Sequence, residues 1–145
     1  MAIHPTVRLL HLTDHHLFED REAVLHGTIT YETLSTVIEH IRDSKYRADA
    51  IIITGDLIQD DSETAYIRFQ ELIKVLGLPV YCVPGNHDIK LIMQKLLSVD
   101  KFHYCPSVHH GNWLITGIDS CVDGLSLIHI SEPTRPRLIS YAVFC

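Results

Sequence analysis

The chain lacks the features that mark several classes of protein. No apolar run approaches the roughly 20 residues that a membrane-spanning helix needs, and the start has no basic region followed by an apolar stretch. Internal repeats and low-complexity linkers are also absent. The cysteines are few and widely spaced, with no Cys-x-x-Cys, so neither a thiolate zinc site nor a redox pair is predicted. We expect a cytoplasmic protein with reduced thiols and no membrane partner. The cysteines are Cys82, Cys105, Cys121 and Cys145.

An excess of positive charge is missing as well. The 145 residues carry a formal net charge of −6, which argues against a broad electrostatic contact with nucleic acid or anionic membrane. Apolar residues are nevertheless plentiful, at 46% of the chain. A chain of this length forms about one domain and buries roughly two thirds of its unfolded surface. The composition therefore predicts a globular protein with no nucleic-acid polymer as partner.

Three short apolar runs alternate with patterns of helical spacing. The continuous β-branched run at residues 51–53 is typical of a strand that is buried on both faces. The order strand-helix-strand-helix-strand predicts an α/β fold with a parallel sheet and right-handed crossovers. The predicted strands are residues 7–12, 50–54 and 80–83, and the predicted helices are residues 31–41, 65–76 and 89–97.

The sequence also predicts how these helices begin and end. Thr30 is placed as the N-cap of the first helix, after a loop over residues 17–30. Asp60 and Glu63 have the spacing of a capping box before the second helix. Gly77 follows that helix and is expected to close it.

Polar side chains follow all three predicted strands. Asp14 and His16 come after the first strand, Asp56 after the second, and Asn86 and His87 after the third. Because the carboxyl ends of parallel strands meet at one edge of a sheet, we expect these side chains to converge. Oxygen ligands combined with imidazole suit Mn, Fe or Zn in a phosphate-handling centre.

The spacing within the first motif supports a shared ligand face. In an extended segment, residues at i and i+2 point the same way, so Asp14 and His16 would reach one ion while His15 points elsewhere. The alternative is an aspartate that caps the next turn beside an incidental histidine. A polar turn with helix caps is likewise the alternative for residues 85–88.

Three motifs resemble the first three motifs of the calcineurin-like metallophosphoesterases, in the same order: Asp14-x-His16, Gly55-Asp56 and Gly85-Asn86-His87-Asp88. From about residue 7 to residue 124, the flanking sequence is similar to the class III cyclic-nucleotide phosphodiesterases, the bacterial cyclic AMP phosphodiesterase group. The resemblance implies the N-terminal portion of a two-sheet β-sandwich flanked by helices, in which the parallel strands are followed by a hairpin. It also implies a dinuclear metal centre at one rim.

The resemblance further implies which residues hold the ions. Asp14 and His16 would hold one ion, Asp56 would bridge both, and Asn86 would hold the second. The cofactors would be two divalent or mixed-valence ions, Fe or Mn, with Zn as an alternative. The implied reaction is hydrolysis of 3',5'-cyclic AMP to 5'-AMP by a hydroxide that bridges the two ions.

By the same resemblance, Asn86 and His87 contact the substrate, His87 assists catalysis, and Asp88 orients His87. The chemistry agrees with these roles. Two cations neutralise a phosphodiester and lower the pKa of a bridging water. Displacement then expels an alkoxide, and His87 is the side chain best suited to protonate it at neutral pH.

The sequence departs from the family pattern downstream of these motifs. The pattern asks for a later histidine and a Gly-His-x-His motif, and neither occurs. We expect the His109-His110 pair to be a solvated strand end, since Gly111-Asn112 predicts a hairpin turn into a strand at residues 113–118. Asp119 follows that strand with no assigned role. The remaining histidines are expected at the surface or in packing, at His4, His11, His26, His40, His103 and His129.

We expect that the stretch from residue 125 to residue 145 does not continue the family, because it looks like translated adapter read-through; the alternative is a genuine divergent tail. We therefore divide the chain into a partial metallophosphoesterase domain, residues 1–124, and a non-native tail, residues 125–145. With an incomplete ligand set, the chain is expected to be inactive or nearly so. The alternatives are a non-enzymatic fragment, or a phosphoesterase that acts on another phosphomonoester or diester. Oligomeric state is not predicted.

Overall fold

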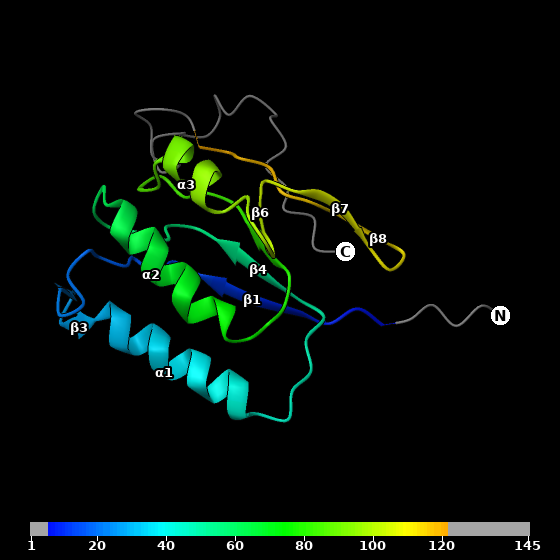
Figure 1. Ribbon diagram of the computed structural model, residues 1–145, viewed down its shortest axis with the longest axis horizontal. Helices are drawn as coiled ribbons and strands as arrows, with labels where there is room; N and C mark the ends of the chain where they lie inside the picture. The colour runs from blue at the N-terminus through cyan, green and yellow to red at the C-terminus, as the bar shows by residue number, and fades with distance from the viewer. Residues whose placement is uncertain (1–5, 122–145) are drawn as a thin grey trace, which may run out of the picture.

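The structure is a computed structural model that describes residues 6–121, in which strands alternate with helices (Figure 1). Within this range, no helix combines the length and the apolar character needed to cross a membrane. The elements in chain order are β1 (Leu9–Thr13), β2 (Val24–Leu25), β3 (Thr28–Ile29), α1 (Thr30–Asp43), β4 (Ala50–Thr54), α2 (Glu63–Lys74), β5 (Val80–Cys82), α3 (Lys90–Leu96), β6 (Phe102–Tyr104), β7 (Ser107–His110) and β8 (Trp113–Thr116).

The centre of the fold is a parallel sheet of four strands in the order β1-β4-β5-β6. Leu10 pairs with Ile51, Ile51 pairs with Val80, and Val80 pairs with Phe102. All four carboxyl ends therefore lie along one rim, as the parallel arrows of β1 and β4 indicate in Figure 1. The predicted α/β class and parallel sheet are confirmed, and β6 adds a strand that the sequence did not predict.

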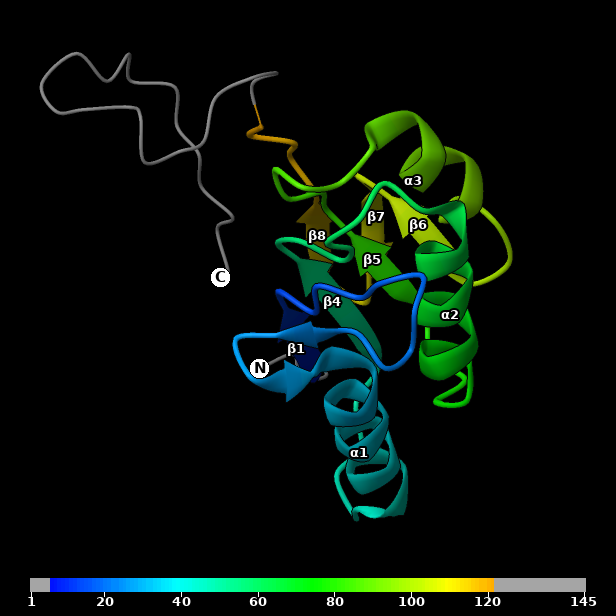
Figure 2. The ribbon, with the colours of Figure 1, turned by 90° about the vertical axis from the view of Figure 1, so that its left-hand side faces the viewer.

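The three helices cover one face of this sheet, as Figure 2 shows. Alternate residues of each strand point into this layer, and they meet the apolar sides of the helices in one continuous core. Fully burying one large apolar side chain stabilises a fold by about 1.5–3 kcal/mol, so this layer is the main source of stability. Its largest fully buried side chains include Ile38 of α1, Tyr66 and Phe69 of α2, Ile51 and Ile53 of β4, and Met93 of α3.

The opposite face of the sheet is covered in part by the β7–β8 hairpin. Val108 and Ile115 of the hairpin pack on Ile52 and Tyr81. The strands join at residues 111–112, as the sequence predicted, because the ladder closes at the pair formed by residues 110 and 113. Leu9 of β1, at the sheet edge, is 40% exposed, so in the described part of the chain the hairpin does not cover this whole face.

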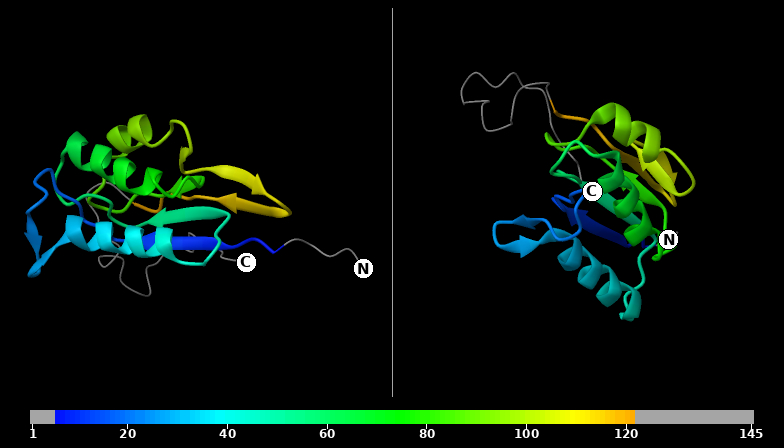
Figure 3. Two further views of the ribbon diagram at one scale, coloured as in Figure 1. Left: turned by 60° about the horizontal axis from the view of Figure 1, so that its bottom comes forward. Right: turned by 60° about the vertical axis from the view of Figure 1, so that its left-hand side comes forward.

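The segment before α1 is more ordered than predicted. Residues 17–30 were expected to be a loop, but they include the antiparallel β2–β3 ribbon, which lies directly before α1 in Figure 3. Thr30 is the first residue of α1 and not its cap. The cap is Ile29, which makes no side-chain cap hydrogen bond. The Thr30 hydroxyl instead donates to the His16 carbonyl oxygen at 3.0 Å, which ties the start of α1 to the rim.

The predicted capping box at the start of α2 is also wrong. Ser62 is the N-cap, and its hydroxyl accepts from the Thr64 backbone N–H. The Asp60 carboxylate instead accepts from the Glu19 N–H at 2.8 Å, a partner 41 positions earlier. The Asp60 carboxylate therefore makes a tertiary contact and does not cap α2. Gly77 closes the helix as expected, with a φ of +68°.

Candidate metal centre

The residues after β1 and β4 converge at the rim. Asp14, His16 and Asp56 each offer one ligand atom, and these three atoms all lie within 4.8 Å of one another. His16 Nε2 is 4.0 Å from Asp56 Oδ2. The His87 ring, from the segment after β5, packs edge-on against the His16 ring with 5.7 Å between centroids. The strand ends therefore bring together side chains that are far apart in sequence, such as His16 and His87.

The backbone places Asp14 and His16 in a different way from the one predicted. The alternation argument assumed an extended segment, but β1 ends at Thr13, and Asp14 and His16 have φ values of 55° and 47°. Residues other than glycine seldom adopt this left-handed conformation, and instances cluster at functional sites. A strained turn, not strand alternation, brings the two side chains toward Asp56.

A chain of hydrogen bonds from the open face of the sheet orients Asp14. Thr13 Oγ1 donates to Asp14 Oδ2 at 2.6 Å, Thr54 Oγ1 donates to Thr13 Oγ1 at 3.2 Å, and His11 Nε2 lies 2.7 Å from Thr54 Oγ1. Desolvation alone would raise the pKa of Asp14. The hydrogen bonds from Thr13 and from the Asp56 N–H outweigh it, together with the nearby histidines, and hold this pKa below its ordinary value. These contacts therefore favour the ionised carboxylate of Asp14.

Asp56 joins the two loops of the rim. It is only 8% exposed, and its Oδ1 accepts from the His87 N–H at 2.8 Å. Gly85 makes this contact possible, because a Cβ atom there would lie 2.5 Å from the Asp56 backbone nitrogen and would also overlap Asp56 Oδ1. Asn86 and His87 are exposed at the rim. Their predicted roles in metal and substrate binding stay predictions.

Asp88 does not pair with His87 as the motif implied. Its carboxylate accepts from the Leu57 N–H at 3.2 Å, from the Gly85 N–H at 2.9 Å and from the Tyr66 hydroxyl at 2.9 Å. His87 Nδ1 lies 3.4 Å from the side-chain nitrogen of Gln59. Adjacent residues on a turn point in different directions, and Asp88 points into the protein, where it is 8% exposed. Burial raises the pKa of Asp88, against the hydrogen bonds that lower it.

His15 lies away from the cluster, as predicted. Its ring is 5.4 Å from the Phe69 ring between centroids, and its two nitrogens are buried without a hydrogen-bond partner among the described residues. Desolvation lowers the pKa of His15 from its ordinary 6.5 to about 4. The unfolded chain therefore binds this proton more readily than the folded chain, and stability is lost as the pH falls from about 6.5 towards 4.

We expect the His15→Leu variant to be more stable than wild type by about 1 kcal/mol at pH 7, because it removes two buried polar atoms that have no partner. It should also lose less stability between pH 7 and pH 5. Urea denaturation at both pH values measures the two effects. The matched control is His40→Gln, at an exposed position of α1. A His15→Leu variant that is less stable than wild type at pH 7 would show that the imidazole has a favourable partner.

The segment after β8 is fastened beside the rim loops. Lys90 Nζ donates to Asp119 Oδ2 at 2.9 Å and to the Cys121 carbonyl oxygen at 2.8 Å.

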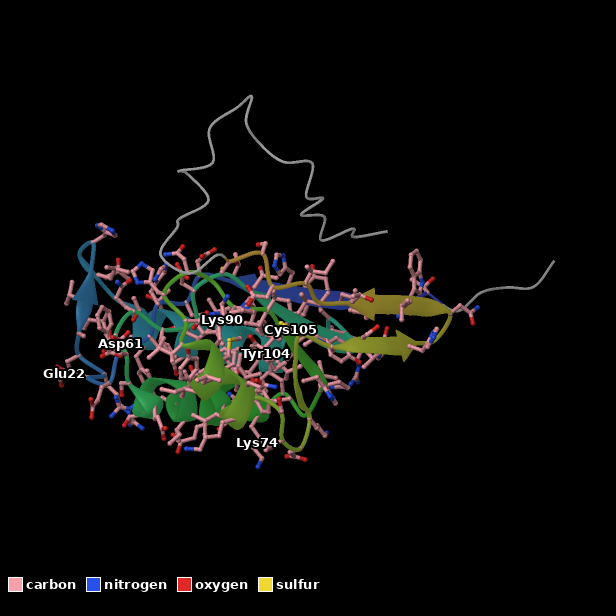
Figure 4. The ribbon with its side chains drawn as sticks, turned by 90° about the horizontal axis from the view of Figure 1, so that it is seen from above. Glu22, Asp61, Lys74, Lys90, Tyr104 and Cys105 are labelled. Carbon is pink, nitrogen blue, oxygen red and sulfur yellow. The ribbon has the colours of Figure 1, made fainter. Side chains whose placement is uncertain are left out.

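The described cysteines are not paired with one another. Figure 4 shows Lys90 near Tyr104 and Cys105, and both the Lys90 charge and the Tyr104 hydroxyl act to lower the pKa of the Cys105 thiol. Burial still raises the pKa of Cys105. Cys82, Cys105 and Cys121 are free thiols, and Cys145 lies outside the described residues.

The histidine pair of the hairpin behaves as a strand end. His109 is exposed, and His110 Nδ1 lies 3.2 Å from the Tyr81 hydroxyl. Neither belongs to the carboxylate and imidazole group at the rim.

The donor set at the rim fits a divalent metal ion. Asp14 and Asp56 supply carboxylate oxygens and His16 supplies an imidazole, the combination that suits Mn, Fe or Zn. The His16 Nδ1 atom is buried and has no hydrogen-bond partner among the described residues. The fold and this cluster define an α/β protein with a candidate metal centre at the carboxyl ends of parallel strands.

Comparison with known proteins assigns the family. Residues 7–139 match the profile described as calcineurin-like phosphoesterase, and the chain belongs to this family. It is 37% identical over 129 residues to the 3',5'-cyclic adenosine monophosphate phosphodiesterase CpdA of Haemophilus influenzae, covering 88% of this chain and 47% of that protein. The protein of the same name from Escherichia coli K12 is 38% identical over 127 residues, covering 87% and 46%. The chain thus spans about half the length of the curated relatives that it matches.

Membership of this family implies divalent metal ions, and Asp14, His16 and Asp56 form a group that could hold one. Three further residues around this group were not predicted from the sequence. They lie in the flanks that resemble the cyclic-nucleotide phosphodiesterases, but the sequence assigned them no site role, and their contacts with site residues emerge only from the structure: Thr13, Gln59 and Tyr66.

Proposed function

We propose that this chain carries the first metal ligands of a phosphodiesterase that hydrolyses 3',5'-cyclic AMP to 5'-AMP. The convergence of Asp14, His16 and Asp56 on one rim is the observation that supports it most directly. Relatives named as cyclic AMP phosphodiesterases, at 37% and 38% identity, support the choice of substrate. The proposed partner is therefore a small phosphoester.

We expect the residues at the rim to have two roles: some would bind the ions, and His87 would transfer a proton. Asp14 and His16 would hold one ion, Asp56 would contact both ions, and Asn86 would hold the second. When bound, two such ions neutralise the phosphodiester and activate water as the nucleophile. We propose Fe or Mn, because mixed oxygen and imidazole ligands suit these metals, with Zn as the alternative.

His87 would protonate the leaving alkoxide. Three features support this role: the ring is exposed at the rim, it lies beside His16, and its backbone is fixed by the hydrogen bond to Asp56. The side-chain nitrogen of Gln59, which lies 3.4 Å from His87 Nδ1, would help to orient the ring. An imidazole is also the side chain that can donate a proton near neutral pH.

A chimaera tests this function in a chain of the relatives' length. Residues 7–121 would replace the matching segment of the Haemophilus relative, and hydrolysis of cyclic AMP would be measured with Mn²⁺, after chelation and after Mn²⁺ is restored. We expect activity that disappears on chelation and returns with Mn²⁺. In the same chimaera, His87→Ala should lower kcat by about 100-fold or more, the usual contribution of a general acid.

Two results would favour the alternatives. A folded chimaera that hydrolyses p-nitrophenyl phosphate or bis-p-nitrophenyl phosphate but not cyclic AMP would point to another phosphoester as substrate. A folded chimaera that binds Mn²⁺ and hydrolyses none of these compounds would point to a non-enzymatic role. The low activity of the 145-residue chain and its cytoplasmic location stay predictions.

A further inference from the structure

Tyr66 places the only polar atom of its side chain inside the helical layer. The side chain is 0% exposed, and its hydroxyl lies at the level of the turn after β5. The hydroxyl donates to Asp88 Oδ1 at 2.9 Å and accepts from the Ile89 N–H at 2.9 Å. Since a buried hydroxyl without partners is costly, these two contacts fix the turn against α2.

Asp88 connects the Tyr66 hydroxyl to the loops at the rim. Its carboxylate accepts from the Leu57 N–H, the residue after Asp56, and from the Gly85 N–H, the residue before Asn86. One buried carboxylate therefore fastens the loop after β4 to the loop after β5. These are the loops that present Asp56 and Asn86.

We propose that Tyr66 is a positioning residue for the metal centre: through Asp88, its hydroxyl sets the spacing between the Asp56 loop and the Asn86 loop. This inference rests on the proposed function, since it assigns Tyr66 to the same site. Helix α2 is a rigid support for such a role, because its apolar side is embedded in the core. Without the hydroxyl, the buried Asp88 side chain loses a donor, and the Ile89 N–H loses its acceptor.

The chain offers a matched control for removal of this one oxygen atom. Tyr81 is also buried, at 6% exposed, but it lies on the other face of the sheet. Its hydroxyl contacts His110 Nδ1 at 3.2 Å and touches neither rim loop in the described structure. Tyr81→Phe therefore removes a buried tyrosine hydroxyl without changing the metal centre.

Mn²⁺ affinity separates positioning from general stabilisation. In the 145-residue chain, free Mn²⁺ would be followed by electron paramagnetic resonance during titration of wild type, Tyr66→Phe and Tyr81→Phe, with the folded state checked by circular dichroism. We expect Tyr66→Phe to bind Mn²⁺ about 10-fold more weakly, and Tyr81→Phe to bind it as wild type does. Equal affinity in all three proteins, or equal losses in both variants, would overturn the proposal.

Hydrogen exchange supplies a readout that needs no metal. The amide protons of Leu57, Gly85 and Ile89 should exchange about 10-fold faster in metal-free Tyr66→Phe than in wild type or Tyr81→Phe. Without the hydroxyl contacts, local opening of these loops costs less free energy. Unchanged exchange at these amides would overturn the positioning role. If neither the wild-type chain nor the wild-type chimaera binds Mn²⁺, the proposed function fails, and the exchange rates alone decide the role of Tyr66.

A second variant covers the case in which Tyr66→Phe does not fold. Asp88→Asn interrupts the same network from its other end, because the carboxamide nitrogen would face donors. It should show the same loss of Mn²⁺ affinity and the same faster exchange at Leu57 and Gly85. A folded Asp88→Asn variant with wild-type affinity and wild-type exchange would overturn the proposal.

Discussion

The Asp56→Asn variant should bind Mn²⁺ at least about 100-fold more weakly than the wild-type chain. Asparagine keeps the shape of the side chain and can keep the hydrogen bond from the His87 N–H, but it removes the charge at the centre of the cluster. Asp56 is the carboxylate that faces both His16 and the loop after β5, so no other described side chain can replace it. Isothermal titration calorimetry with Mn²⁺ measures the loss.

The same variant should be more stable than wild type when metal is absent. Asp14, Asp56 and the buried Asp88 bring negative charges together, and repulsion between them is relieved when one is neutralised. A gain of about 1 kcal/mol corresponds to a rise in the thermal midpoint of a few degrees. The control is Asp61→Asn, at an exposed position outside the cluster. Mn²⁺ affinity within threefold of wild type in Asp56→Asn would remove Asp56 from the metal centre.

The Gly85→Ala variant should lose about 3 kcal/mol or more of folding stability, at the upper end for overpacked substitutions. The added Cβ would lie 2.5 Å from the Asp56 backbone nitrogen and 2.6 Å from the Gly55 carbonyl carbon. Both are backbone atoms, so the clash cannot be relieved by rotating a side chain. The two loops would have to separate, which also breaks the bond from the His87 N–H to Asp56.

Gly77→Ala provides the comparison for Gly85→Ala. Gly77 has a φ of +68° and nothing within 4 Å of the position of an added Cβ, so alanine there costs only the strain of the left-handed backbone, roughly 1–2 kcal/mol. Urea denaturation of both variants separates the two costs. Equal losses would mean that the loops at the rim can move apart without penalty.

The sequence predicted the parts of the fold that depend on local composition. The β-branched run at residues 51–53 is typical of a strand with both faces covered, and it forms β4 within the sheet. Strand β6 was missed because its three residues, 102–104, are too short to show a period. The β2–β3 ribbon was missed for the same reason, since each of its strands has two residues.

For the candidate site, too, the sequence predicted which residues converge but not the turn or the long-range contacts that position them. That Asp14, His16 and Asp56 would meet followed from strand order alone, but the left-handed turn that aims the first two could not be read from their spacing. Asp88 was assigned to His87 because they are neighbours in sequence. Its partners are Leu57 and Tyr66, 31 and 22 positions away, and contacts over such distances exist only after the chain has folded.

Strand β1 is an edge strand, and among the described residues it pairs only with β4. Asp14 and His16 directly follow β1, whereas Asp56 follows β4. Whenever β1 undocks, two of the three ligands leave together, so the candidate centre exists only in the fraction of molecules whose edge strand is in place. Local unfolding of one edge and loss of the metal site are thus a single equilibrium. A divalent ion that binds there would draw the population towards the docked strand and lower the exposure of its unpaired backbone.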